Sequence, residues 1–268
     1  HDTKRSAPCM LRTQHTGGAF HFTIQTDEKE AFMMYYDLSK HCSVIGKVIK
    51  KPDRSFSFLA YLLKGKNNVL IDTVPERSSE LFMKELTDQL PLSSLNALIL
   101  NHSENDHSGA LGLLLAQKPE LPIYCTPACK VRLSGDYPKA NFIPVEHGSF
   151  IKLGEYTFRF IHTPGLHWED NMVTFLEEDE TLFSNDLFGQ YLGAEPPVDR
   201  GFTKEEILSG VTSYFEKVFQ AASAEERGIL ASILELPTKC IAPGHGVILE
   251  KHFETVLSFY RQECVIAI

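Results

Sequence analysis

The chain has 268 residues and a mass of 30.2 kDa, with 43% apolar and 23% charged residues. These proportions are typical of a globular protein and exclude a disordered or fibrous one. Its 26 basic and 35 acidic side chains leave a formal net charge of −9, which disfavours binding to nucleic acid and to acidic lipid surfaces. The sequence contains no apolar run of about 18 residues that could cross a bilayer. We therefore expect neither nucleic acid nor a membrane as a partner.

The N-terminal segment and the cysteines indicate the compartment. Residues 1–18 contain no apolar segment followed by a cleavage pattern, so no secretory signal is expected. The six cysteines form no CxxC pair, and a chain of this length does not need disulfides in order to fold. We expect reduced cysteines and a cytoplasmic location.

The first half of the chain predicts strands, a helix and a buried strand. Apolar residues alternate in two runs between residues 19 and 36, separated by TDEKE, which is typical of a hairpin. Strands at 56–63 and 69–74 follow, joined by the turn residues GKNN. Residues 78–90 have helical spacing, with Ser78 as the N-cap. The continuous apolar run at 96–100 predicts a strand that is buried on both faces.

The second half repeats this order of elements. It predicts strands at about 140–145, 155–161, 171–177 and 181–185, and helices near 203–219, 224–235 and 253–264. No Pro/Gly/Ser-rich linker or block of charge separates the halves, so we expect a single domain over residues 1–268. Two β-rich halves, each followed by helices, predict an α/β sandwich in which two packed sheets are flanked by helices.

The chemistry of the chain is concentrated directly after the strand at 96–100. The sequence there reads NHSENDHSG, and an apolar helix follows it. His102, Glu104, Asp106 and His107 are four side chains that can bind a metal. On a strand-to-helix loop they can point towards one place, whereas on a regular helix or strand half of them would face away. The alternative is a polar loop in which one or two of these residues cap the helix.

Three more metal-binding side chains arrive singly, each after an apolar, strand-like run. His167 follows FRFIHTPGL, Asp186 follows TLFSN, and His245 follows CIAPG. One ion seldom takes more than about six ligands, whereas two ions that share a bridging carboxylate can use the whole set of four His, one Glu and two Asp. The set therefore predicts a two-metal site.

The ordered series of H-x-E-x-D-H, His in LHW, Asp in SND and His between two glycines resembles the diiron domain of the flavodiiron proteins. The resemblance covers nearly the whole chain, and it implies an αββα sandwich of the metallo-β-lactamase type. It also implies two iron ions (Fe2+/Fe3+), with an oxo, hydroxo or peroxo bridge left open. The ligands that it implies are His102, Glu104 and His167 for one iron, Asp106, His107 and His245 for the other, and Asp186 as the bridge.

Two departures from the related hydrolases favour iron over zinc. Hydrolases of this fold typically read His-x-His-x-Asp-His and bind zinc, whereas this chain has Glu104 at the second position. A carboxylate makes the pocket harder and more anionic, which favours a redox-active ion. The run His162-Thr163-Pro164-Gly165 also resembles the hydrolases' HTPGH turn, but Leu166 moves the candidate ligand to His167.

Other residues near these motifs are expected to support the site. Glu169 and Asp170 are candidates to accept a hydrogen bond from the second ring nitrogen of a ligand histidine. Tyr191 stands where many family members carry His, and it either donates a hydrogen bond to a metal-bound oxygen species or packs in the core. His147 and His162 are expected behind the ligands or at the surface. No catalytic residue is expected beyond the metal ligands.

The resemblance also bears on cofactors and assembly. Flavodiiron proteins typically continue into a flavodoxin-like domain whose FMN feeds electrons to the irons of a neighbouring subunit. No phosphate-binding loop of that kind precedes the end of this chain at Ile268, so no FMN is expected, and the chain is either a catalytic fragment or a stand-alone domain. The sequence leaves the oligomeric state undecided between a monomer and a homodimer.

These expectations lead to three functional hypotheses. The first is an O2-binding diiron protein in which a diferrous pair reduces O2 to a bridging peroxide, acting with a signalling partner as an oxygen sensor in bacterial signalling such as chemotaxis. The second is an O2 or NO reductase that takes electrons from an external donor such as a rubredoxin-like protein. The third is a zinc hydrolase of the same fold, which Glu104 disfavours.

Overall fold

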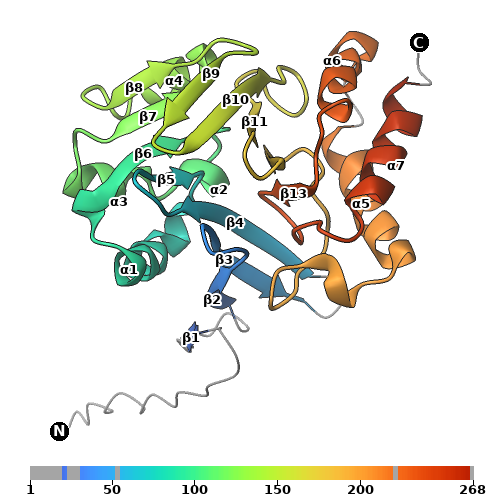
Figure 1. The fold of residues 1–268 in the computed structure, drawn as a ribbon, viewed down its shortest axis with the longest axis horizontal. Helices are drawn as coiled ribbons and strands as arrows, with labels where there is room; N and C mark the ends of the chain where they lie inside the picture. Colours follow the sequence, from blue (N-terminus) through green and yellow to red (C-terminus); the bar gives the residue numbers. More distant parts are fainter. Residues whose placement is uncertain (1–19, 23–30, 52–54, 220–222, 266–268) are drawn as a thin grey trace, which may run out of the picture.

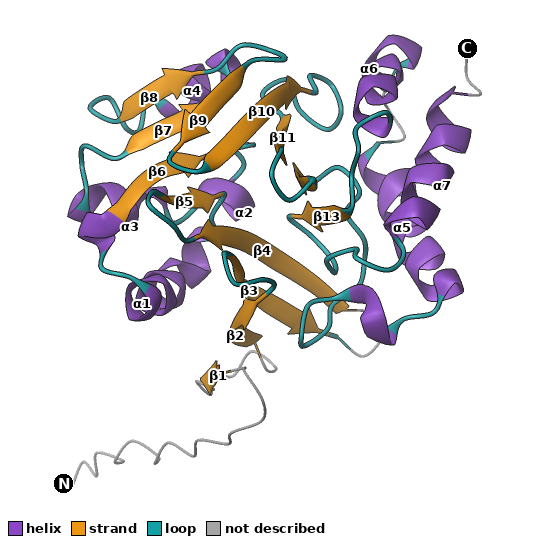
Figure 2. Ribbon diagram, in the orientation of Figure 1, coloured by secondary structure: helices purple, strands orange, loops and turns teal. Residues whose placement is uncertain are grey.

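Two β-sheets pack face to face, with helices on the outer side of each sheet (Figures 1 and 2). The computed structural model describes residues 20–22, 31–51, 55–219 and 223–265. This arrangement is the αββα sandwich that the sequence predicts.

Among the described residues, the first sheet has eight strands in sequence order. The strands run antiparallel from β1 to β5 and parallel from β5 to β8, because the later crossovers contain helices. The strands are β1 (Phe20–Phe22), β2 (Ala31–Asp37), β3 (Cys42–Lys50), β4 (Ser55–Leu63), β5 (Asn68–Ile71), β6 (Leu95–Ile99), β7 (Pro122–Cys125) and β8 (Asn141–Pro144). The α-helices of this half are α1 (Ser79–Gln89), α2 (Asn105–Ser108), α3 (Leu111–Gln117) and α4 (Pro127–Leu133), and the 3-10 helices are η1 (Glu76–Ser78) and η2 (Leu92–Ser94).

In the part of the chain that the structure describes, the second sheet has five strands in the order β13-β12-β11-β10-β9. It is antiparallel except for the pair β12 and β13. The strands are β9 (Phe150–Leu153), β10 (Tyr156–His162), β11 (Met172–Leu176), β12 (Thr181–Asn185) and β13 (Cys240–Pro243). The helices of this half are η3 (Asp199–Gly201), α5 (Lys204–Val218), α6 (Ala224–Leu234) and α7 (Phe253–Val265). None of the helices among the described residues combines the length and the apolar character that a bilayer crossing requires.

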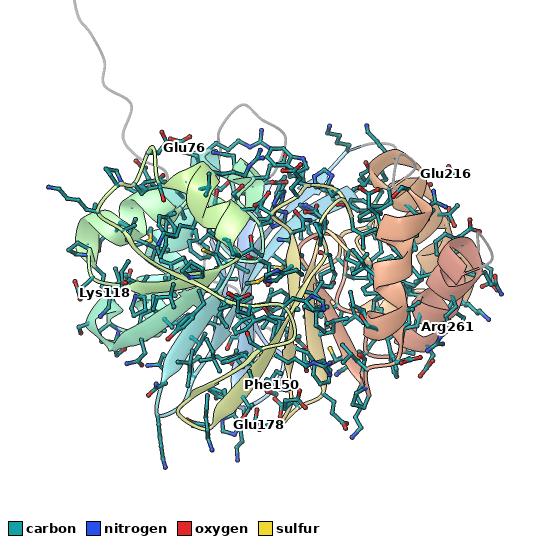
Figure 3. All side chains as sticks on the ribbon, turned by 90° about the horizontal axis from the view of Figure 1, so that it is seen from above. Glu76, Lys118, Phe150, Glu178, Glu216 and Arg261 are labelled. Carbon is teal, nitrogen blue, oxygen red and sulfur yellow. The ribbon has the colours of Figure 1, made fainter. Side chains whose placement is uncertain are left out.

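Three apolar clusters hold the layers together. The cluster between the sheets joins residues such as Tyr61 of β4 to Phe158 and Phe183 of the second sheet. The other two clusters pack α1, α3 and α4 on the first sheet and α5, α6 and α7 on the second. Charged residues such as Lys118 and Arg261 lie at the periphery (Figure 3). As predicted, β6 is buried on both faces along most of its length, because Ala97 and Ile99 join the inter-sheet cluster and Leu98 joins an outer cluster, whereas Asn96 is exposed.

Most of the predicted elements are confirmed within a few residues. The first hairpin pairs Phe20 with Tyr35, although its connecting residues 23–30 lie outside the described part of the chain. The strands β3, β7 and β9 and the helices α2 and α4 lie outside the predicted elements, and α2 is a single turn within the segment predicted as a loop. In β3 the apolar residues are interrupted by Gly46 and Lys47, so neither an alternating nor a continuous apolar pattern marks it.

The predicted N-cap position of α1 is confirmed, but the capping hydrogen bond is missing. Ser78 does precede α1, but its side chain makes no capping hydrogen bond. Its hydroxyl instead accepts a hydrogen bond from Nζ of the buried Lys47, at 3.3 Å.

Candidate metal centre

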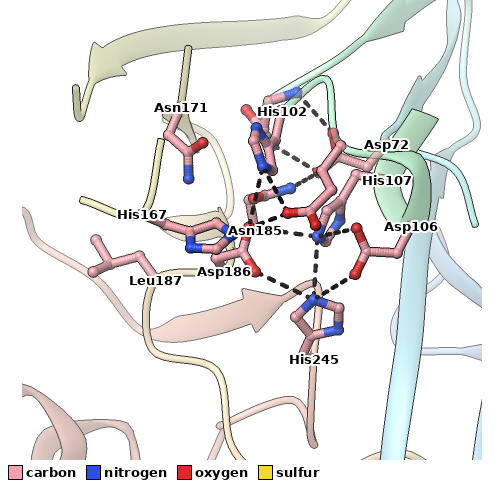
Figure 4. A network of polar contacts seen from close by, with 12 residues as sticks. Asp72, His102, Asp106, His107, His167, Asn171, Asn185, Asp186, Leu187 and His245 are labelled. Atoms are coloured by element: carbon pink, nitrogen blue, oxygen red, sulfur yellow. Dashed lines mark hydrogen bonds and ion pairs between the residues drawn. The ribbon is translucent and has the colours of Figure 1, made fainter. Parts of the chain in front are cut away.

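The predicted ligands lie together where strands of both sheets end (Figure 4). His102 and Glu104 lie in the loop after β6, and Asp106 and His107 lie on the single turn of α2. His167, Asp186 and His245 follow β10, β12 and β13, whose carboxyl ends share one edge of the second sheet because these three strands run in the same direction. The fold therefore gathers residues that are far apart in the sequence.

These side chains form two triplets, and in each triplet the candidate ligand atoms all lie within 4.8 Å of one another. In the first triplet, Glu104 Oε2 lies 3.3 Å from His102 Nε2 and 2.9 Å from His167 Nε2. In the second, His245 Nε2 lies 3.1 Å from His107 Nε2 and 3.4 Å from Asp106 Oδ2. Each triplet contains two histidines and one carboxylate.

Asp186 lies between the triplets. Its Oδ2 is 4.0 Å from Nε2 of His102 and 3.5 Å from Nε2 of His107, and its Oδ1 is 3.2 Å from Nε2 of His245. The hydroxyl of Tyr214 donates a hydrogen bond of 2.8 Å to Oδ1. Asp186 Oδ2 is buried and accepts no hydrogen bond from the described residues, and neither does Asp106 Oδ1. Because buried polar atoms are normally paired, these two oxygens fit a site that takes cations.

The electrostatics of the side chains are those of a closely coupled histidine–carboxylate cluster. Hydrogen bonds from His102 and His167 lower the pKa of Glu104 to about 2. Burial opposes the charging of His102, but its hydrogen bonds with Asp170 and Glu104 outweigh burial and raise its pKa to about 9. In the same way, Asp106 and Asp186 raise the pKa of the buried His245 to about 10. In the protein without metal, protonated imidazoles therefore balance the carboxylates.

Burial alone would raise the pKa of Asp106 and of Asp186. For Asp106, His107 and His245 outweigh burial and lower the pKa below its usual value. The same two histidines hold the pKa of Asp186 well below its usual value. Both carboxylates are therefore ionised, which is the state that binds a metal.

The second ring nitrogens of two histidines are held by buried acceptors. His102 Nδ1 lies 3.2 Å from Asp170 Oδ2, and His245 Nδ1 lies 2.9 Å from the backbone oxygen of Ser57. Of the two predicted acceptors, Asp170 is buried and makes this contact, whereas Glu169 is exposed. Such outer partners fix the ring orientation and the tautomer of a metal ligand.

A further buried carboxylate, Asp72, supports the site and lies outside the predicted set. It has a left-handed backbone (φ 56°), and it accepts hydrogen bonds from the backbone and the side chain of Asn101 and from the side chain of Asn185. Burial raises its pKa. These contacts tie together the ends of β5, β6 and β12. The signal in the sequence is the same as for the ligands: Asp72 directly follows the apolar strand at 68–71.

Aromatic rings enclose the centre on two sides. The ring of Phe56 stacks on His245 at a centroid distance of 4.6 Å, and the rings of Trp168 and His102 form an edge-to-face pair at 5.0 Å. Tyr191 packs against Phe56 at 5.6 Å and against Tyr214 at 5.2 Å, which favours the packing interpretation of this residue.

The remaining predicted histidines belong to neither triplet. His147 and His162 contact each other, with ring centroids 5.8 Å apart, and His162 Nε2 lies 3.0 Å from the backbone oxygen of Val145. This position agrees with the prediction that they are not ligands.

The centre is open on one side. The side chains of Glu104, Asp106 and His167 are 36%, 27% and 23% exposed, whereas His102, His107, His245 and Asp186 are at most 4% exposed. A small molecule can therefore approach from the side on which the three exposed residues lie.

Two facing sheets, outer helices and a histidine–carboxylate cluster at the strand ends define an α/β protein of the metallo-β-lactamase-like class. The family described as "ODP family beta lactamase" matches residues 56–246. The chain belongs to this family.

The chain is similar to proteins of the flavodiiron type. It is 34% identical over 203 residues to the anaerobic nitric oxide reductase flavorubredoxin of Aeromonas salmonicida. This alignment covers 74% of this chain and 39% of that protein. A variant of the flavo di-iron protein of Thermotoga maritima superimposes with a TM-score of 0.76 and 27% identity, covering 86% of this chain and 61% of the other. The rubredoxin oxygen:oxidoreductase of Desulfovibrio gigas, at 20% identity and a TM-score of 0.79, shares the fold. The chain thus spans 39% to 61% of the length of these relatives, which is less than two thirds in each case.

Proposed function

We propose that this chain holds two non-haem iron ions and reduces NO or O2 with electrons from an external donor. Supporting evidence comes from one buried carboxylate, Asp186, which lies within 4.0 Å of histidines from both triplets. The proposed ligands are His102, Glu104 and His167 for one ion, Asp106, His107 and His245 for the other, and Asp186 as the bridge.

The donor set supports iron. Each triplet offers two imidazoles and one carboxylate, a combination typical of non-haem ferrous sites that keep coordination positions open for a small molecule. The exposed side of Glu104, Asp106 and His167 supplies access to such positions.

The protein's own groups would position the ions. Asp170 orients the ring of His102, the backbone of Ser57 orients that of His245, and the hydroxyl of Tyr214 holds Asp186. A pair of ferrous ions, when bound, supplies the two electrons that, with two protons, convert two NO molecules to N2O and water. The low pKa of Glu104 keeps this exposed ligand charged, so Glu104 itself does not supply these protons.

Reduction of NO or O2 is preferred here over sensing. The relative that is 34% identical is named as a nitric oxide reductase, and its name and that of the D. gigas protein suggest rubredoxin-type electron donors. Oxygen sensing and a role in chemotaxis remain predictions from the sequence, and no described residue favours them over reduction. A zinc hydrolase is the least supported alternative, because Glu104 stands where hydrolases of this fold typically carry a second histidine, and the relative that is 34% identical is named as a reductase.

The test starts with metal analysis of protein that was purified without added metal, followed by anaerobic loading with ferrous iron. We expect two irons per chain and steady consumption of NO or O2 when a reduced rubredoxin is present. The variant Asp186→Asn should lose the bound iron and the consumption of NO or O2. The control variant Glu169→Gln, at an exposed residue outside the ligand set, should retain the iron and the activity. Two zinc ions with esterase or lactamase activity, or iron-loaded protein that consumes neither gas, would overturn the proposal.

A further inference from the structure

A pocket that is separate from the metal centre lies beside it. Its cavity has a volume of about 190 Å3, and its walls include Phe56, Phe58 and Tyr191 together with the cations Lys51, Arg77 and Lys217. Phe56 and Phe58 also contact the ring of His245, at centroid distances of 4.6 and 5.4 Å. These two phenylalanines therefore contact both the pocket and the metal centre, whereas the three cations line the pocket alone.

The aromatic walls suit a flat, apolar group. Phe56 meets Phe58 edge-on at 5.2 Å and meets Tyr191 at 5.6 Å, so the rings enclose the cavity at different angles. Aromatic rings prefer offset-stacked and edge-to-face neighbours, and an aromatic guest can adopt either arrangement here. A cavity of about 150 Å3 lined by apolar side chains is known to hold one benzene ring. The pocket is thus large enough for a single ring that carries one small substituent.

The cations come from three separate elements. Lys51 directly follows β3, Arg77 lies in η1, and Lys217 lies in the last turn of α5. None of the three makes an ion pair or a hydrogen bond with another described residue.

The positive charge of this pocket contrasts with the chain as a whole, whose formal net charge is −9. Cations that line one small cavity raise its potential and attract an anion. Because the three side chains have no carboxylate partner among the described residues, a bound anion would not have to displace an existing ion pair.

We propose that this pocket binds an anion that carries one aromatic ring, such as an aryl carboxylate or an aryl phosphate. The ring would lie against Phe56 and Tyr191, and the anionic group would face Lys51, Arg77 and Lys217 at the rim. The proposal does not depend on the identity of the metal, and its binding step can be measured on protein without metal. If the irons bind as proposed, the guest would lie one phenylalanine away from the ligand His245.

The experiment measures binding of benzoate and of phenyl phosphate by calorimetry. Acetate and inorganic phosphate test the need for the ring, and benzyl alcohol tests the need for the charge. We expect benzoate and phenyl phosphate to bind at least about tenfold more tightly than these comparison compounds, because three exposed charges each contribute modestly. In a labelled sample, proton contacts between the guest and the rings of Phe56 and Tyr191 should locate it.

A triple variant, Lys51→Gln, Arg77→Gln and Lys217→Gln, should weaken benzoate binding about tenfold or more. The matched control changes three lysines outside the pocket, Lys130, Lys139 and Lys152, to Gln and should bind benzoate as the parent does. Equal binding of acetate and benzoate, an equal loss in the control, or no detectable binding at millimolar benzoate would overturn the proposal. Metal content measured in parallel separates this outcome from a failure of the proposed diiron function.

Discussion

The variant Asp170→Asn tests how far the outer contacts of the centre determine its affinity for metal. Asp170 is fully buried, and its Oδ2 accepts hydrogen bonds from His102 Nδ1 at 3.2 Å and from the backbone nitrogen of Ser103 at 2.8 Å. Its other oxygen lies 3.7 Å from Nε of Arg132. An asparagine keeps one acceptor oxygen but removes the negative charge.

The expected loss follows from the type of hydrogen bond. A bond to a charged group contributes about 1.5–3 kcal/mol, and a neutral one contributes about 0.5–1.5 kcal/mol. The difference of roughly 1–1.5 kcal/mol corresponds to about tenfold in affinity, at the lower end of the range of about 10- to 100-fold that is typical of such outer contacts.

The loss should also depend on pH. In the metal-free protein the pKa of His102 is raised to about 9, so a proton competes with the metal for this ring at neutral pH. The variant removes the carboxylate that stabilises this proton on His102. In the variant, the proton therefore competes less strongly with the metal. The ratio of parent to variant affinity should therefore grow as the pH rises from 7 towards 9.

The assay is an anaerobic competition between the protein and a coloured chelator for ferrous iron, at several pH values. The control is Glu169→Gln, which neutralises the exposed neighbouring carboxylate. Thermal melting of both variants verifies that they fold. Parent-like affinity of Asp170→Asn at pH 9, or an equal loss in Glu169→Gln, would refute this reasoning.

Three further predictions concern stability and metal content. Chelation should lower the melting temperature of the loaded protein, because converging carboxylates lose their cations; an unchanged melting temperature would contradict this. The metal-free protein should lose stability as pH rises. Folding raises the pKa of His102 from 6.5 to about 9 and that of His245 from 6.5 to about 10. The protonated rings therefore contribute fully to folding stability below about pH 6.5, and this contribution is lost as the pH rises through the raised pKa values. Denaturant titrations at each pH measure this, and a flat profile from pH 6.5 to 10 would argue against it. Gly244→Ala would place a Cβ 2.5 Å from Cε1 of His107. It should therefore reduce bound iron from two ions towards one, measured by metal analysis, whereas parent-like content would show that the ring can move.

Much of the fold could be predicted from the sequence, because its signals are local. The apolar run of β6 and the helical spacing of α1 each lie within a short window, and the structure confirms both. The set of seven candidate ligands could also be named, since each follows an apolar strand and so lies at a strand end. In contrast, β3 lies in the middle of the first sheet, where its neighbours β2 and β4 provide the pairing that its interrupted pattern does not indicate.

The sequence by itself determined which side chains are available for metal chemistry and the order in which the chain presents them. Only the tertiary structure decided which of them are buried, which neighbour supports each one, and where the centre is open. Asp170 and Glu169 are adjacent and chemically alike, yet only Asp170 faces His102. Likewise, Phe56 meets His245 only because β4 of one sheet lies beside the loop after β13 of the other. Such contacts depend on the packing of distant segments, which no local pattern of residues records.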